Sequence, residues 1–281
     1  MTPLLDRDFP DPGILAGRDG RYYMYGTETA GQWNVQLAVT DDFQRAEHLG
    51  DALPYLPSWA RRGKTWAPKP VYGPDDVVLL YFTACHEGTG TQALGVAWAS
   101  DPAGPFIPYE LPLIVGFIDA EVYQDTDGPV LFCAGGDEQT GGIWAQSLTP
   151  DGLSLKGPQV KVICADRPDE HGVVEAPIVR RHGPYVYLLH SSNGFATTDY
   201  NISYAFALDA FGPYSKPRRN HVLASYPGVK GPGHGDVVEL RDGTLMLVYH
   251  GWADGLVGYD RGGYRALYAT PLTWQGGRPT V

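Results

Sequence analysis

A repeat of about 55 residues constrains this chain more than any other feature of its sequence. Five similar segments run from end to end, and each leads through a Gly-containing turn into an aromatic-rich or aliphatic run. The segments are marked by Asp11, Trp66, Asp119, Glu175 and His234. The steps between these positions are 55, 53, 56 and 59 residues. A period of this length indicates a propeller or a solenoid array.

Short runs of β-branched and aromatic residues decide between these two architectures. Bounded by Gly, Pro and Asp, they predict strands at 21–26, 34–40, 77–83, 94–100, 185–191 and 201–207. No stretch has the long 3.6-residue periodicity of a helical solenoid, and WD-type propellers need a shorter period of about 40–45 residues. The sequence therefore predicts an all-β fold, a five-bladed β-propeller, as a single catalytic domain over residues 1–281.

The connections between blades are predicted from their composition. Segments 51–64 and 164–172 are rich in Pro, Asp and Arg, so we expect loops there. Segment 265–273 has the Ala, Leu, Tyr and Thr content of a strand. Such a terminal strand either completes the first blade or belongs to a last blade that is closed by non-covalent packing alone.

Composition excludes several classes of protein. With 43% hydrophobic and 19% charged residues, the chain can build a sizeable core. A net charge of −11 without a Lys/Arg cluster argues against nucleic acid as a partner. No apolar run has the length of a membrane span, and no apolar signal core follows Met1, so we expect a cytoplasmic protein unless a leader was removed. The three cysteines lack metal-site spacing and are predicted to be buried free thiols.

The repeat brings chemistry to one place. The first strand of each propeller blade lines the central channel, so residues at one repeat position converge there. Asp11, Asp119 and Glu175 would bring three carboxylates to one pocket, together with Trp66 and His234. Two carboxyl groups across a pocket are the machinery for cleaving a glycosidic bond. A third nearby raises the pKa of the acid and keeps it protonated.

Each of these residues has a plainer interpretation when it is taken alone. An Asp-Pro pair such as Asp11-Pro12 is a common turn former. His234 lies between glycines, and a lone histidine is usually structural. Asp125–Gly128 resembles the start of a calcium loop, but the rest of that pattern is missing and a hairpin turn is the better prediction. The shared repeat position favours the catalytic interpretation for the three carboxylates together.

Taken in order, the motifs resemble glycoside hydrolase family 43, five-bladed propeller enzymes that act on arabinose- and xylose-containing polysaccharides. The resemblance covers essentially the whole chain. It rests on Asp8–Pro12, Tyr22–Tyr25, Thr65–Pro68, Phe117–Asp119, Val174–Pro177, Gly231–Gly235, Tyr249-His250, Arg265 and Pro271–Trp274. Each motif is weak alone, but the ordered set is specific.

The resemblance implies roles for the three carboxylates. Asp11 would be the general base and Glu175 the general acid of an enzyme that inverts anomeric configuration. Asp119 would raise the pKa of the acid and orient it. Here the chain departs from many relatives, because Ala120-Glu121 follows Asp119 where those relatives carry Asp-Pro. Strand alternation points Glu121 to the same side as Asp119, so Glu121 competes for the tuning role.

The resemblance also implies binding roles. Arg265 would hold a sugar hydroxyl or the tuning aspartate, and Phe9 and Trp66 would pack against the sugar ring. His234 would approach an axial ion or water, with one calcium ion in the central channel as the expected cofactor. No other cofactor is expected.

These residues together predict a function with open alternatives. We expect release of terminal α-L-arabinofuranose from arabinose- or xylose-containing oligosaccharides. β-Xylosidase and endo-α-1,5-L-arabinanase activities use the same three carboxylates and remain alternatives. A non-catalytic sugar-binding propeller is the alternative from another class, but it has no reason to keep three carboxylates at matching positions.

Overall fold

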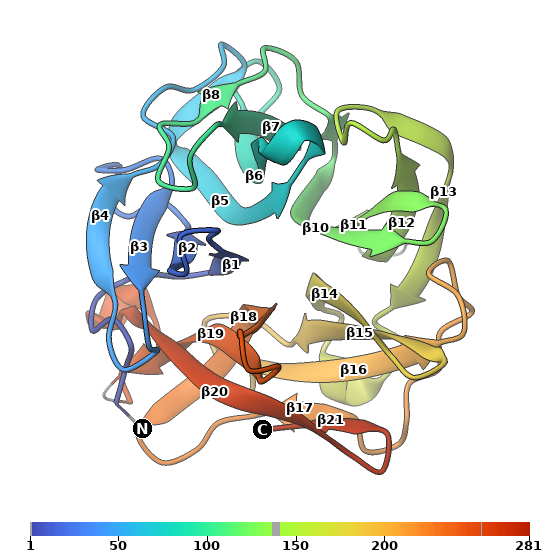
Figure 1. Ribbon diagram of the computed structural model, residues 1–281. Helices are drawn as coiled ribbons and strands as arrows, with labels where there is room; N and C mark the ends of the chain where they lie inside the picture. Colours follow the sequence, from blue (N-terminus) through green and yellow to red (C-terminus); the bar gives the residue numbers. More distant parts are fainter. Residues whose placement is uncertain (1, 137–140, 254) are drawn as a thin grey trace.

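The computed structural model describes residues 2–136, 141–253 and 255–281. These residues form five sheets arranged in a ring around a common axis, which confirms the predicted all-β, five-bladed propeller (Figure 1). The helical elements of the described residues are three short 3-10 turns: η1 (Pro74–Asp76), η2 (Pro168–Glu170) and η3 (Tyr259–Arg261). None of the described helices has the length and apolar character needed to cross a membrane.

The blades follow the chain in order, each starting with its innermost strand. Blade one contains β1 (Gly13–Ala16), β2 (Tyr22–Gly26), β3 (Gln36–Thr40) and β4 (Glu47–Asp51). Blade two contains β5 (Ala60–Tyr72), β6 (Val78–His86) and β7 (Gln92–Ala99), with β8 (Ile107–Pro108) and β9 (Ile114–Val115) both paired to β7. Blade three contains β10 (Phe117–Asp125), β11 (Gly128–Gly135), β12 (Gly142–Leu148) and β13 (Leu155–Cys164). Blade four contains β14 (Val174–His182), β15 (Tyr185–Ser192), β16 (Asn201–Ala207) and β17 (His221–Leu223). Blade five contains β18 (Val229–Glu239), β19 (Leu245–Ala253), β20 (Arg265–Gln275) and β21 (Arg278–Thr280).

The predicted strands are confirmed, with shifts at their ends, as β2, β3, β6, β7, β15 and β16. The predicted loop at 51–64 is wrong in its last part, because β5 already begins at Ala60 and pairs with His86. Its Arg-Arg-Gly-Lys sequence looked like a loop because this end of the strand is largely exposed to solvent. At Asp125–Gly128 the chain makes the predicted hairpin turn between β10 and β11.

The ring is closed by non-covalent packing, which was the second of the two predicted closures. β20 and β21 are the third and fourth strands of blade five, so they do not complete blade one. The N-terminal segment instead lies beside β20, where the backbone N–H of Leu4 donates to the carbonyl of Leu267 at 2.7 Å. Leu5 adds a single antiparallel bridge to the same residue.

Neighbouring blades pack through buried aromatic and aliphatic side chains. The cluster shared by blades one and two includes Tyr23, Tyr25, Leu80 and Phe82, all almost fully buried. The cysteine thiols are free, and Cys85 and Cys133 are buried as predicted, whereas Cys164 is only partly buried.

The innermost strands contact one another around the axis: β1 touches β5 and β18, β10 touches β5 and β14, and β14 touches β18. Each blade has one residue other than glycine with left-handed backbone inside its innermost strand or within two residues of it. These residues are Asp11 (φ 54°), Ala67 (φ 49°), Asp119 (φ 59°), Ala176 (φ 52°) and His234 (φ 34°). In β5, β10, β14 and β18 the pairing with the next strand shifts register at this place.

This common bulge defines which positions are equivalent. Ala67 and Ala176 are the counterparts of Asp11, Asp119 and His234, so the predicted placement of Trp66 and Glu175 at the repeat position is wrong by one residue. Because successive side chains of a strand point in opposite directions, the side chains of Trp66 and Glu175 project from the backbone in a different direction from that of Asp119. A left-handed conformation costs an L-residue about 1–2 kcal/mol, and such strain concentrates at functional sites.

Candidate active site

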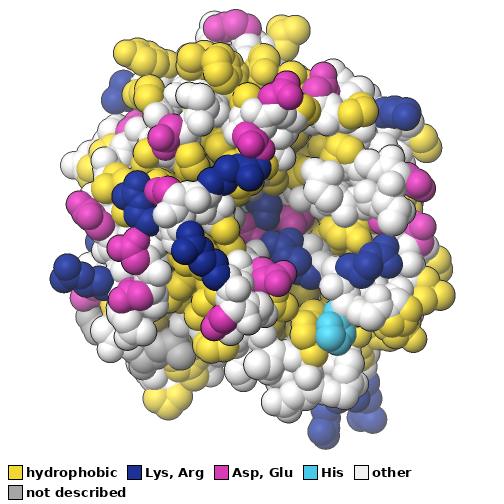
Figure 2. Space-filling view, viewed as in Figure 1, with side chains coloured by type: hydrophobic (Ala, Val, Ile, Leu, Met, Phe, Trp, Pro, Cys, Tyr) yellow, Lys and Arg dark blue, Asp and Glu magenta, His cyan; other side chains and the backbone are white. Residues whose placement is uncertain are grey.

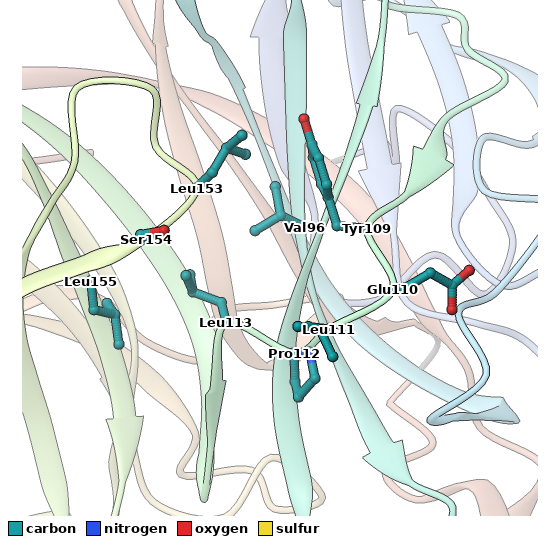
Figure 3. A pocket seen from close by; sticks show the side chains of 9 residues that line it. All are labelled: Val96, Tyr109, Glu110, Leu111, Pro112, Leu113, Leu153, Ser154 and Leu155. Atoms are coloured by element: carbon teal, nitrogen blue, oxygen red, sulfur yellow. The ribbon is translucent and has the colours of Figure 1, made fainter.

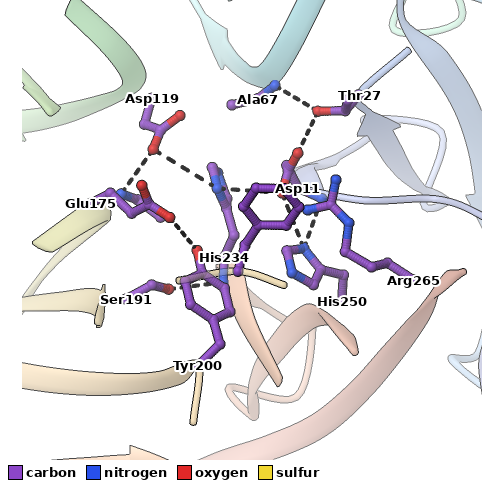
Figure 4. Close-up of polar contacts among 12 residues, drawn as sticks. Asp11, Thr27, Ala67, Asp119, Glu175, Ser191, Tyr200, His234, His250 and Arg265 are labelled. Carbon is purple, nitrogen blue, oxygen red and sulfur yellow. Dashed lines mark hydrogen bonds and ion pairs between the residues drawn. The ribbon is translucent and has the colours of Figure 1, made fainter. Parts of the chain in front are cut away.

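A pocket of about 320 Å³ opens at the axis. Its lining residues come from every blade (Figure 4). They are Asp11, Trp66, Ile118, Asp119, Glu175, Phe195, Tyr200, His234 and Arg265. The structure therefore brings together all of the predicted site residues except Phe9. The repeat achieves this because each blade places its left-handed residue inside the innermost strand that lines the axis or within two residues of it.

The prediction that Phe9 packs against a sugar ring is wrong. Its side chain is 0% exposed and belongs to a core cluster with Ile14 and Met24. The ring lies so close to Gly26 that a Cβ there would come within 2.9 Å of it. Phe9 contributes to the site only indirectly, because its backbone N–H donates to the carbonyl of Arg265 at 2.9 Å.

Asp11 is held as a carboxylate. Its Oδ1 accepts a hydrogen bond from Nη1 of Arg265 at 2.9 Å, and its Oδ2 accepts one from the Thr27 hydroxyl at 2.6 Å. Burial by itself raises the pKa of Asp11, but Arg265, with His234 and His250, outweighs burial and holds that pKa well below its usual range. Near neutral pH, Asp11 is therefore ionised and able to accept a proton.

The two histidines beside Asp11 are uncharged at neutral pH. Burial, supported by Arg265, lowers the pKa of His250 to about 4, and burial lowers that of His234 against the opposing effect of Asp11. The Nδ1 atom of His250 accepts the backbone N–H of Asp11 at 3.0 Å, which fits a neutral ring. Arg265 is consequently the charged partner that keeps Asp11 ionised.

Asp119 and Glu175 occupy the opposite side of the pocket and retain a proton (Figure 4). Burial raises the pKa of Glu175 to about 7, although a hydrogen bond donated by Tyr200 to its Oε1 at 2.8 Å opposes the shift. Burial and the carboxylates of Glu175 and Asp11 raise the pKa of Asp119 well above its usual range. Losing the last proton from this pair would place two negative charges in one buried pocket, so the pair keeps it near neutral pH.

Backbone groups at the bulges orient this pair. Ala176, directly after Glu175, donates its N–H to Oδ2 of Asp119 at 3.1 Å. The backbone N–H of Asp119 donates in turn to the Thr83 hydroxyl at 3.1 Å. Because Glu175 is offset by one residue, the bulge residue Ala176 supplies the backbone amide that holds Asp119, and the preceding residue, Glu175, supplies the carboxyl group.

Glu121 takes no part in this pocket. Its carboxylate forms ion pairs with Lys69 at 2.5 Å and with Arg180 at 3.0 Å. The structure therefore does not support Glu121 as a rival of Asp119, because both of its oxygens are committed to cations farther along the channel.

The side chains around His234 do not form a set of protein ligands for a calcium ion. Its Nδ1 lies 3.5 Å from Oδ1 of Asp11 and 4.0 Å from Oδ2 of Asp119, and its backbone N–H donates to the Ser191 hydroxyl at 2.9 Å. No group of three or more His, Cys, Asp or Glu side chains among the described residues could hold a metal ion. The axial cavity next to His234 measures about 10 Å³, which is room for about one water. Calcium needs roughly six to eight oxygen ligands.

Arg265 also shapes the mouth of the pocket. Its guanidinium carbon lies 4.9 Å from the ring centre of Phe195, and its Nε donates to the Tyr259 hydroxyl at 2.9 Å. Phe195 is 44% exposed, so its ring is available for contact with a ligand. Trp66, Phe195 and Arg265 also line an adjoining groove of about 500 Å³ that includes Asp8. The pocket and the groove therefore adjoin each other at these three side chains.

Another groove, of about 520 Å³, lies away from the axis and is formed by residues of blades two and three (Figure 3). Aliphatic side chains such as Leu111, Leu113 and Leu153 dominate its lining. Glu110 is the one carboxylate among its described lining residues, so this groove lacks the pair of acids that hydrolysis of a glycoside requires.

A sequence profile of the glycosyl hydrolases family 43 matches residues 1–279. The chain belongs to glycosyl hydrolase family 43. Its fold agrees with the crystal structure of a thermostable family-43 glycoside hydrolase at a TM-score of 0.87 and 28% identity, covering 98% of this chain and 92% of that one. The resemblance inferred from the motifs is thereby confirmed.

Two curated relatives show the range of the family. An extracellular endo-α-(1→5)-L-arabinanase of Bacillus subtilis is 26% identical, over 76% of this chain and 51% of its own length. A β-D-galactofuranosidase of Aspergillus niger is 30% identical, over 61% of this chain and 49% of its own length. The chain thus spans about half the length of the curated relatives it matches.

Sequence reasoning missed several site residues of this family-43 chain. Tyr200, which bonds Glu175, precedes β16; Phe195 lies in the loop after β15; and Thr27 follows β2. They lie outside the innermost strands, so the repeat gives no signal for them. His250 could have been found, because it directly follows the aromatic run of the fifth repeat and stands in a motif that carries the family resemblance.

Proposed function

We propose that this protein is an inverting glycoside hydrolase that releases terminal α-L-arabinofuranose from arabinose- or xylose-containing oligosaccharides. One observation carries the proposal: the pocket holds Asp11, bound to the guanidinium of Arg265, on one side and Glu175, bound to the Tyr200 hydroxyl, on the other. In these surroundings Asp11 is ionised, whereas the pKa of Glu175 is raised to about 7. Two carboxyl groups with opposed protonation states are what general base and general acid catalysis require.

The proposed reaction uses each group once. Asp11 accepts a proton from a water molecule as the water oxygen forms a bond to the anomeric carbon. On the other side, Glu175 donates its proton to the glycosidic oxygen as the bond from that oxygen to the anomeric carbon breaks. The base ends protonated and the acid ionised, so one proton exchange with solvent resets the pair. Attack opposite the leaving group inverts the anomeric centre.

The remaining side chains orient the sugar in this proposal. Arg265 has further N–H groups besides the one bound to Asp11, and these donate to sugar hydroxyls. Trp66 and Phe195 offer ring faces at the mouth for packing against the apolar side of a sugar. Removing either ring is expected to raise KM more than it lowers kcat, because the contact is made in the ground state and transition state alike.

The substrate class is supported by relatives and by shape. Curated relatives of this chain include endo-arabinanases, a xylosidase/arabinosidase and an α-L-arabinofuranosidase. The axial pocket of about 320 Å³ accommodates a terminal sugar, and the adjoining groove of about 500 Å³ has room for further units. That groove is the feature that keeps endo-arabinanase activity as the second candidate.

A substrate panel tests the proposal. Aryl α-L-arabinofuranoside, aryl β-D-xylopyranoside and linear arabinan would be compared for the wild type and Glu175→Ala. We expect hydrolysis of the arabinofuranoside, and we expect arabinose rather than longer fragments from arabinan. Rapid loss of arabinan viscosity would identify the endo-acting alternative. Sugar binding without turnover by the wild type would identify the non-catalytic alternative.

Leaving-group dependence assigns the two carboxylates. Glu175→Ala is expected to lose about 10²–10⁴-fold on an oligosaccharide but far less on a dinitrophenyl glycoside, whose leaving group needs little protonation. Asp11→Ala is expected to lose activity on both substrates, because water activation is needed in either case. Equal losses for both variants on both substrates would contradict the assignment.

A further inference from the structure

Four charged side chains form what we call the axial ion cluster: Lys69, Glu121, Arg180 and Asp236. Three of these side chains are almost fully buried, with exposures of 9% for Lys69, 1% for Glu121 and 3% for Asp236. In the view down the axis of the propeller, basic and acidic side chains lie inside the hollow at its centre (Figure 2). Buried charges at this depth need close partners.

The cluster is electrically balanced. The ammonium of Lys69 lies 2.5 Å from Oε2 of Glu121 and 2.7 Å from Oδ2 of Asp236. Arg180 closes the ring of charges, at 3.0 Å from Oε1 of Glu121 and 3.3 Å from Oδ1 of Asp236. Two cations therefore face two anions, and Lys69 is the more deeply buried cation.

The cluster joins all five innermost strands. Lys69 comes from β5, Glu121 from β10, Arg180 from β14 and Asp236 from β18. β1 is attached through the backbone N–H of Ile14, which donates to Oδ2 of Asp236 at 3.1 Å. No strand at the axis is left outside this network of contacts.

The cluster lies directly next to the residues that carry the proposed chemistry. Glu121 is two positions after Asp119, and Asp236 is two positions after His234. The axial cavity of about 10 Å³ is lined by Asp119 and His234 together with Lys69, Glu121 and Asp236. Movement of the cluster would therefore displace the two bulges that place Asp119 and His234.

We propose that the ammonium of Lys69 is the resident cation of the central channel and a positioning residue for catalysis. By holding Glu121 and Asp236 together, it fixes the bulges that carry Asp119 and His234, so the channel requires no metal ion. The catalytic part of this inference rests on the proposed function. The part that concerns the resident cation does not, because it can be measured by thermal unfolding.

The first experiment uses the wild-type protein. Exhaustive chelation, and calcium added back afterwards, should each change Tm by less than about 1 °C and kcat/KM by less than about twofold, since a ligand that does not bind the folded state does not stabilise it. A Tm that falls on chelation and returns with calcium would overturn the proposal, because a metal ion would then be the resident cation.

The second experiment removes the lysine charge in two ways. Lys69→Met leaves two buried carboxylates with one partner and should lower Tm strongly. The double variant Lys69→Met/Glu121→Gln restores the balance, with Arg180 facing Asp236, and should recover most of that loss. If Lys69 positions the site, the double variant still loses about tenfold or more in kcat while KM changes less than about threefold, because small displacements of catalytic groups reduce rate.

Lys216→Met is the matched control. The Lys216 side chain is 6% exposed and pairs with Asp166 at 2.8 Å and Glu170 at 2.6 Å, away from the axial pocket. It should lower Tm without lowering kcat of the folded protein. Wild-type kcat in the folded double variant would overturn the positioning role. A wild-type protein that is inactive on every glycoside would instead refute the proposed function, while the melting measurements would still decide whether Lys69 is the resident cation.

Discussion

At the scale of single residues, environment gives three similar carboxyl groups two opposite protonation states. Asp11 faces Arg265 and stays ionised, whereas Asp119 and Glu175 face each other with little to compensate their charge. The contrast depends on Arg265, which reaches Asp11 from the start of β20, 254 positions away in the sequence. A pattern of acidic residues alone cannot reveal it.

Two substitutions should move the pH dependence of catalysis in opposite directions. Asp119→Asn removes the neighbouring charge that opposes loss of the last proton, so the pKa of Glu175 falls and the basic limb of kcat/KM moves down. Tyr200→Phe removes the hydrogen bond donated to the ionised Glu175, so that pKa rises and the basic limb moves up. The pH profiles of kcat/KM measure both.

Shifts in the same direction, or no shift in either variant, would contradict this account of the acid. Tyr204→Phe is a suitable control for the tyrosine variant, because Tyr204 is a buried tyrosine of β16 in the core cluster of blades four and five. It should leave the basic limb where it is in the wild type.

At the scale of elements, the bulge repeated near the start of each innermost strand builds the site. Its period was visible in the sequence, so the fold and the convergence of Asp11, Asp119 and His234 could be predicted. The offset of Trp66 and Glu175 could not, because alanine at Ala67 and Ala176 carries no sign of left-handed backbone. The axial ion cluster was missed although Lys69, Glu121 and Asp236 each stand two positions after the bulge residue of their blade, because Lys69 stands there in place of an acid and Arg180 lies outside this period.

Residues outside the innermost strands were beyond prediction for a different reason. Tyr200 and Phe195 reach the pocket from the ends of the β15–β16 connection, whose path depends on the packing of blade four. Phe9 was misplaced because its aromatic side chain next to the site looked like a sugar platform. Its ring instead fills the core between β2 and β20. Nothing in the local sequence distinguishes an aromatic residue of the core from one that contacts a sugar.

The strain at the bulge can be measured with glycine. Ala176→Gly removes a methyl group but relieves the left-handed backbone at φ 52°. Ala205→Gly in β16 removes a methyl group that is equally buried without that relief. In urea unfolding, Ala205→Gly should cost about 1 kcal/mol or more beyond any cost of Ala176→Gly. Equal costs would show that the bulge is not strained.

At the scale of the whole molecule, closing the ring without covalent links brings the two ends of the chain to one site. Segment 4–11 supplies Asp11 and packs on β20, which supplies Arg265. The ion pair between Asp11 and Arg265, which keeps the proposed base ionised, therefore also joins the two segments that close the propeller. The protonation states of the carboxyl groups in this pocket therefore affect both the stability of the folded protein and the proposed catalysis.

Glu175 should lower the stability of the folded protein at neutral and alkaline pH. Its pKa is raised to about 7 in the folded state, so the stability it contributes is complete below its unfolded pKa and is lost as pH rises through about 7. Glu175→Gln should therefore be more stable than the wild type by about 1–3 kcal/mol at pH 8, and the difference should vanish near pH 4. Urea unfolding at both pH values measures it, and a pH-independent difference would contradict the burial argument.

The central claim is that Asp11 activates water on the side of the sugar opposite to the bond that Glu175 protonates. Proton NMR of the hydrolysis of an aryl α-L-arabinofuranoside, recorded before the product mutarotates, tests this most directly. The account predicts that β-L-arabinofuranose appears first. First appearance of the α-anomer would mean retention through a covalent intermediate and would contradict the assignment of Asp11 as the general base.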